Sequence, residues 1–144
     1  MKNELKQELT RRLCECNNGG LVLVMYDIYF GFSEDVKAAL ASNDRAALKK
    51  AVADVQAALD ELMGALDFKY PLAGQLYPLY SYCKRLFSTV LYSLDVSLSI
   101  MLFSHCFNIF SSLCSVFKFS FQPEKSDHFP GIKSVNQLRF RLYS

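Results

Sequence analysis

The side chains best suited to acid–base chemistry at neutral pH are the two histidines, His105 and His128. A catalytic histidine needs a nucleophile beside it and an acidic group that orients its ring. The sequence contains no nucleophile elbow, phosphate-binding loop or paired-carboxylate motif that would supply such partners. His105 adjoins Cys106 within an apolar stretch, where a packed residue is more common than a catalytic pair. We therefore expect a protein that is not an enzyme.

The cysteines could instead hold a metal or form disulfides. They number five and share no repeated spacing, which is typical of free thiols in a reducing compartment. The first two form a Cys-x-Cys pair that could chelate a soft metal, but no histidine or second cysteine pair follows at ligand spacing. We therefore expect no metal and no cofactor. The cysteines are Cys14, Cys16, Cys83, Cys106 and Cys114.

Length and charge restrict the class of protein further. A chain of 144 residues can bury the core of one domain. Its 16 basic and 14 acidic residues give a formal charge of +2, and the basic residues do not cluster, so we expect no nucleic-acid partner. The charged N-terminal segment lacks the apolar core of a signal peptide, which predicts a cytosolic protein.

The composition changes abruptly near residue 88. Residues 1–87 hold 22 charged residues and all 11 alanines, whereas residues 88–144 hold 8 charged residues, 12 serines and no alanine. No Gly/Ser-rich linker separates the two parts. We expect a helical bundle domain over residues 1–121 and a polar, poorly ordered C-terminal tail over residues 122–144.

The segment before residue 67 has the clearest helical pattern. Its apolar residues recur at steps of three and four, which places them in one stripe along a helix. Ser42, Asn43 and Asp44 carry side-chain oxygens that can cap free amides, so we expect the helix to begin near residue 43 or 44. The stripe consists of Leu48, Val52, Val55, Leu59, Leu62 and Leu66.

Two further helices are predicted, one on each side of this segment. Residues 21–40 and 72–94 repeat apolar side chains at helical steps, and the short connections predict antiparallel neighbours. Pro78 cannot donate a backbone hydrogen bond inside the later helix. We therefore expect either a kink there or a regular helix that begins at Tyr77.

Three motifs in these helices resemble those of the FliS family of flagellin export chaperones. An apolar run ends in Met-Tyr-Asp, an ELM-x-x-LD sequence ends the middle helix, and L-x-x-LY-x-Y-x-x-R lies in the next helix. Each motif is weak alone, but their order and separation carry a resemblance over about residues 10–95. The matching positions are Val24, Met25, Tyr26, Asp27, Glu61, Leu62, Met63, Leu66, Asp67, Leu76, Leu79, Tyr80, Tyr82 and Arg85.

The resemblance implies an all-α, antiparallel four-helix bundle in the cytosol. Such a chaperone binds the C-terminal helical segment of newly made flagellin, prevents its premature polymerisation and assists its delivery to the flagellar export machinery. We expect an amphipathic client helix to fill an apolar groove, and tyrosines suit that surface because they join an apolar ring to a polar tip. The expected partner-binding residues are Met25, Tyr26, Ile28, Leu76, Leu79, Tyr80 and Tyr82.

The fourth helix departs from the family pattern, because residues 96–117 contain no charged residue. This length suffices for a transmembrane helix, which would make the chain a membrane-attached protein. His105, Asn108 and six serines within the stretch weigh against a membrane span, so membrane attachment remains the alternative.

Two other interpretations of this stretch also remain open. It could be a buried fourth helix, whose other face would expose phenylalanines to flagellin or to a second copy in a homodimer. A shifted reading frame could instead explain the change in composition, so that residues 88–144 would not be the natural sequence. The expected core stripe is Leu98, Met101, Leu102, Cys106, Ile109, Leu113 and Val116, and the exposed set is Phe103, Phe107, Phe110 and Phe117.

Overall fold

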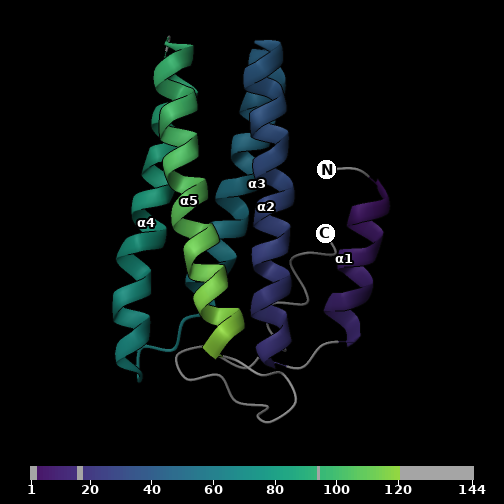
Figure 1. Ribbon diagram of the computed structural model, residues 1–144, viewed down its shortest axis with the longest axis vertical. Helices are drawn as coiled ribbons and strands as arrows, with labels where there is room; N and C mark the ends of the chain where they lie inside the picture. Colours follow the sequence, from purple (N-terminus) through teal and green to yellow (C-terminus); the bar gives the residue numbers. More distant parts are fainter. Residues whose placement is uncertain (1–2, 16–17, 94, 121–144) are drawn as a thin grey trace.

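The computed structural model describes residues 3–15, 18–93 and 95–120 and shows only helices there as regular elements. The last four helices form an antiparallel bundle, and the first helix packs against its side (Figure 1). This confirms the predicted all-α fold. The helices are α1 (Asn3–Glu15), α2 (Asn18–Ser42), α3 (Arg45–Gly64), α4 (Pro71–Tyr92) and α5 (Val96–Ser120).

The bundle is a ring in which α2 contacts α3, α3 contacts α4, α4 contacts α5, and α5 returns to α2. Figure 1 shows α2 and α5 side by side in front of α3 and α4. Successive helices are therefore neighbours, as the short connections predicted. The core lies between the four helices and contains apolar side chains from each of them.

Helix α1 was not among the predicted helices. It buries Leu9 and Leu13, one turn apart, and contacts α2. The Arg12 guanidinium lies 2.8 Å from the Asp27 carboxylate of α2, which adds an ion pair to this small apolar contact. α1 is amphipathic with a narrow apolar face, and its high charge concealed that face in the sequence.

Helix α3 begins where the sequence predicts. Asp44 is its N-cap, and the Asp44 carboxylate accepts hydrogen bonds from the backbone amides of Ala46 and Ala47. Asn43, just before the cap, has φ of 52°, a left-handed conformation that asparagine tolerates better than most residues. All six residues of the predicted stripe are buried.

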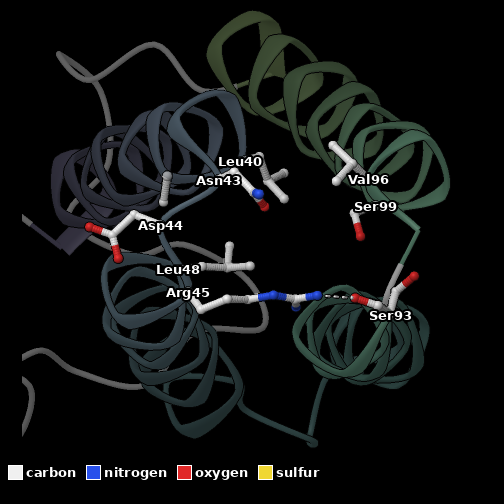
Figure 2. Close-up of a pocket in the computed structure, with 9 residues that line it drawn as sticks. Leu40, Asn43, Asp44, Arg45, Leu48, Ser93, Val96 and Ser99 are labelled. Atoms are coloured by element: carbon white, nitrogen blue, oxygen red, sulfur yellow. Dashed lines mark hydrogen bonds between the residues drawn. The ribbon is translucent and has the colours of Figure 1, made fainter.

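The same end of the bundle joins α3 to the turn between α4 and α5. The Arg45 guanidinium donates to the backbone carbonyls of Leu91 and Ser93, at 3.3 and 3.0 Å (Figure 2). It thereby places a positive charge at the negative end of the α4 dipole. The Asp95 carboxylate accepts hydrogen bonds from backbone amides in the first turn of α5. The end of α4 and the start of α5 are therefore both capped by side chains.

Helix α4 excludes one of the two alternatives predicted at Pro78. The helix begins at Pro71, in the first-turn position that proline favours, and continues through Pro78 to Tyr92. The regular helix therefore does not begin at Tyr77. Pro78 is exposed, so a carbonyl left without its helical donor there can bond to water.

Helix α5 closes the bundle, but it is rotated about its axis relative to the predicted orientation. Phe103 and Phe110 are buried, whereas Met101 and Val116 are 66% and 62% exposed. Phenylalanine buries more apolar area than these residues, and its rings find aromatic partners on α2 and α4. The buried stripe is Ser99, Phe103, Cys106, Phe110 and Cys114.

The exposed side of α5 carries no charge but mixes polar and apolar residues. Serines, His105 and Asn108 on it can form hydrogen bonds with water, and Ile100, Met101 and Val116 are exposed among them. Half-buried leucines and Ile109 lie at the margin between this face and the core. The side chain of Phe117 and the predicted tail over residues 122–144 lie outside the described residues.

Replacing Phe110 with alanine tests this orientation of α5. The change empties the space between α2 and α4, so we expect the free energy of unfolding to fall by about 3–5 kcal/mol. Met101→Ala is the matched control on the same helix and should change that free energy by less than about 0.5 kcal/mol. Urea unfolding followed by circular dichroism measures both. The reverse order of the two losses would contradict the orientation.

Candidate functional site

The seven residues predicted to bind a partner lie on α2 and α4, but most of them are buried. Met25, Tyr26, Ile28, Leu76 and Tyr80 are each at most 6% exposed. In the closed bundle these five side chains have no surface to offer a partner. Leu79 is half-buried and Tyr82 is 38% exposed, so these two can be contacted from outside.

Phe110 of α5 occupies the space over the buried tyrosines. Its ring stacks on Tyr29 with centroids 3.9 Å apart and on Tyr80 at 5.6 Å, and it meets the edge of Tyr26 at 5.7 Å. The space between α2 and α4 is therefore filled by the chain's own α5. Phe110 is fully buried as a result.

The Tyr26 and Tyr80 hydroxyls form a hydrogen bond of 2.6 Å that joins α2 to α4 beneath α5. Burial raises the pKa of Tyr80 to about 12, although the hydrogen bond from Tyr26 acts to lower it. Burial also raises the pKa of Tyr26 far above its usual value, with a further increase from the neighbouring Tyr80. Both phenols are therefore neutral at physiological pH and act as structural hydrogen-bonding groups.

Tyr29, the third tyrosine that Phe110 contacts, lies in a different polar environment. Burial raises the pKa of Tyr29 well above its usual range, and the nearby thiols of Cys106 and Cys83 add to the increase. Its hydroxyl makes no well-formed hydrogen bond to a described residue, although Ser33 lies close enough to offset part of the pKa increase. The contact between α5 and the bundle is thus aromatic with buried phenols and thiols at its centre.

Tyr82, one of the two accessible residues of the predicted set, lies where α4 packs against α5. Its ring meets the His105 ring of α5 edge-on, with the ring centroids 6.2 Å apart. The residues one turn before and one turn after Tyr82 on α4, and likewise those around His105 on α5, are half-buried and apolar. We call this surface the α4–α5 seam and define it as Leu79, Tyr82, Leu86, Leu102, His105 and Ile109.

A second concave surface lies on the other side of α5. A cavity of about 170 Å³ between α2 and α5 has Phe103 and Phe107 among its lining residues, with Glu34 and Lys37 on the α2 side. Ser104 and Asn108 complete its lining on the α5 side. It is large enough for one or two side chains of a partner, and the opposite charges at its rim do not favour a partner of either sign.

The cavity near Arg45 is too small to bind a partner. It measures about 10 Å³, roughly the space of one water molecule. Figure 2 shows Arg45 extending across it towards Ser93, with Leu40 and Val96 on the opposite side. This cavity belongs to the capping arrangement at the helix ends.

One described helix meets the length and composition criteria for a membrane span. It covers Val96–Val116 with a mean hydropathy of 1.5, and 22% of its most apolar window is buried in the bundle. Its buried face contacts α2 and α4, and its exposed side carries serines, His105 and Asn108 together with Ile100 and Met101. The described part of the helix therefore has both polar and apolar residues on its exposed side.

The sequence analysis missed the aromatic residues of α5 as core positions. The spacing of Phe103, Cys106 and Phe110 is as helical as that of the aliphatic stripe that we predicted, so periodicity alone could not separate the two. The distribution of polar residues was the available signal. The exposed serines and Asn108 lie together on the face away from the phenylalanines.

The described residues contain no group of three histidine, cysteine, aspartate or glutamate side chains that could hold a metal ion. The family model described as flagellar protein FliS matches residues 1–115. This match extends beyond the predicted limit near residue 95 and includes most of α5, which disfavours a shifted reading frame before residue 115. No curated protein sequence matches the chain.

Alkaline pH should destabilise the bundle through its buried tyrosines. Below about pH 9 these phenols are neutral in the folded and unfolded states, so they add no pH dependence. Above pH 10 the unfolded chain loses protons that the folded chain retains, because the pKa of Tyr80 is raised from 10.0 to about 12. Tyr80 alone should then lower the free energy of unfolding by about 1.4 kcal/mol between pH 8 and pH 11.

Urea unfolding of Tyr80→Phe at the two pH values measures this contribution. The loss of stability between pH 8 and pH 11 should be smaller by about that amount than in the unmodified protein. Tyr82→Phe, which removes the hydroxyl of an exposed tyrosine on the same helix, serves as the control. Its free energy of unfolding should fall between pH 8 and pH 11 by nearly as much as that of the unmodified protein. Equal pH dependence in all three proteins would show that Tyr80 titrates as a solvated phenol.

Proposed function

Because the chain belongs to the FliS family of flagellar export chaperones, we propose that it binds the C-terminal helical segment of flagellin in the cytosol. Binding would prevent premature polymerisation of flagellin and assist its delivery to the flagellar export apparatus. The family match over residues 1–115 is the observation that carries this proposal. It also makes the protein a member of a chaperone family and not of an enzyme family.

The surface that we assign to the client is the α4–α5 seam. It contains Leu79 and Tyr82, the two predicted partner-binding residues whose side chains are accessible. An amphipathic helix docks through apolar anchors three or four residues apart. The seam residues recur at the same spacing, as Leu79, Tyr82 and Leu86 on α4 and as Leu102, His105 and Ile109 on α5. Tyr82 adds an aromatic ring with a polar tip, a combination that is common at binding surfaces.

The absence of charge on α5 supports this assignment. Residues 96–117 contain no charged side chain. A client helix that docks against α5 would therefore remove water from serines, His105 and Asn108 but from no charged group of α5. Arg85 lies close to Tyr82 along α4 and is exposed, so a basic group is available near the seam for an acidic residue of the client.

The buried members of the predicted set then have a supporting role. Tyr26 and Tyr80 contact Phe110, so they hold α5 in position instead of contacting the client directly. Met25, Ile28 and Leu76 belong to the same core. Their substitution is expected to reduce stability first and client binding only as a consequence.

A membrane-attached protein is the second candidate function, favoured by the hydropathy of Val96–Val116. In that case α5 would leave the bundle and insert in lipid. Fractionation of cells that produce the full chain separates the two candidates. We expect the protein in the soluble fraction together with flagellin. Recovery only after detergent extraction of membranes would favour insertion instead.

Replacing Tyr82 with alanine tests the assigned surface. The change removes an exposed ring from the seam, so we expect affinity for a peptide of the flagellin C-terminal segment to fall by roughly tenfold, the effect of about 1.4 kcal/mol. The melting temperature should change little, because the side chain is only partly buried. Isothermal titration calorimetry and thermal unfolding measure the two quantities.

Tyr92→Ala is the matched control for this experiment. Tyr92 is also on α4 but is 81% exposed and lies at the end of the helix, away from the seam. Its replacement should leave the affinity within about twofold of the unmodified protein. If Tyr92→Ala weakens binding and Tyr82→Ala does not, the client occupies another surface.

A further inference from the structure

Two thiols from different helices meet inside the bundle. Cys83 of α4 and Cys106 of α5 are both buried and free. The Cys106 thiol points at the Cys83 backbone carbonyl, with the sulfur 4.0 Å from the oxygen. Each thiol affects the pKa of the other, so the two side chains are neighbours across the α4–α5 contact. A disulfide between them would join the two helices.

We propose that Cys83 and Cys106 are a site of oxidative modification, at which a peroxide converts the two thiols into a disulfide that locks α5 to α4. This inference does not depend on the identity of the client. It concerns the chain alone and would hold for a bundle with any function.

The environment of the pair assigns a role to each sulfur. The hydrogen bond from Cys106 lowers the pKa of Cys83, while burial opposes this effect. The same hydrogen bond and burial raise the pKa of Cys106 far above its usual value. Cys83 is therefore the sulfur that becomes a thiolate and attacks, and Cys106 is the thiol that resolves the product.

The reaction proceeds in two balanced steps. The Cys83 thiolate attacks one oxygen of hydrogen peroxide, the O–O bond breaks, and protonation of the leaving hydroxide gives water and a sulfenic acid on Cys83. The Cys106 sulfur then attacks the Cys83 sulfur, which forms the S–S bond and releases the sulfenic oxygen as a second water. Two thiols are oxidised and one peroxide is reduced to two waters.

The other described cysteines are placed differently. Cys114 is buried on α5 two turns beyond Cys106, and it lies close enough to Tyr26 to affect the pKa of that phenol. Cys14 is exposed on α1. Cys14 and Cys16 are close in sequence and could react with each other, so both are best replaced by serine in the test protein.

The cross-link has a structural consequence. It would close a loop from residue 83 to residue 106 that contains the turn between α4 and α5, which restricts the unfolded chain. We expect the oxidised protein to unfold at a temperature roughly 5–10 °C higher than the reduced protein. Reduction by a dithiol should reverse the shift.

The experiment uses the full chain with Cys14→Ser and Cys16→Ser. It is treated with hydrogen peroxide, and its intact mass, its thiol content after denaturation and its melting temperature are measured. The intact mass should fall by about 2 Da, the mass of the two lost hydrogens, and digestion should give one peptide pair linked through Cys83 and Cys106. Adding Cys114→Ser should leave this product unchanged, whereas adding Cys83→Ser should abolish it.

Other outcomes would overturn the proposal. A gain of about 32 Da at Cys83 without a cross-link would mean that Cys106 does not reach the sulfenic acid before it is oxidised further. A link through Cys114, a link between two chains, or unreacted thiols after denaturation would each contradict the assigned pair. A cross-link that forms without raising the melting temperature would contradict the locking of α5.

Discussion

The docking of Phe110 onto the tyrosines of α2 and α4 is the contact on which the closed bundle depends. One ring of α5 touches Tyr29, Tyr80 and Tyr26, and the last two are joined to each other by a hydrogen bond of 2.6 Å. Aromatic contacts of this kind are directional, so they fix both the depth and the rotation of α5. That rotation decides which residues of α5 face the solvent.

The surface properties follow from this rotation. With Phe103 and Phe110 inward, α5 presents serines, His105 and Asn108 to the solvent together with exposed apolar residues such as Met101, and it places half-buried aliphatic residues at its margins. The helix has no charge between residues 96 and 117. A partner that docks on α5 therefore avoids the large cost of desolvating an ion of that helix, and this absence of charge underlies the assignment of the α4–α5 seam to a helical client.

Most of the fold was predictable from periodicity, because one stripe dominates each of the charged helices. In α3 the stripe from Leu48 to Leu62 and the Asp44 cap agree with the structure, since charged residues leave only one face that can be buried. The last residue of the predicted stripe, Leu66, is also buried but lies just beyond the helix end at Gly64. In α5 two apolar stripes compete, and tertiary packing of Phe110 decides between them. α1 was missed because its buried face consists of Leu9 and Leu13 among charged neighbours.

The candidate site was predictable only in part, for a related physical reason. Tyrosine suits a partner surface and an aromatic core equally well, so the sequence could not distinguish Tyr82, which is exposed, from Tyr80, which is buried two residues earlier. Two positions along a helix are about 200° apart, and this angle places the two rings on different sides of α4. In the closed bundle, Leu79 and Tyr82 are the members of the predicted set whose side chains are accessible.

In the proposed function, the intact bundle receives a helix of flagellin along the α4–α5 seam. Hydrogen–deuterium exchange of the full chain, with and without a peptide of the flagellin C-terminal segment, tests it most directly. We expect new protection of backbone amides over residues 79–86 and 102–109, with α5 remaining as protected as in the free protein. Faster exchange throughout α5 on binding, or protection confined to other helices, would contradict the claim.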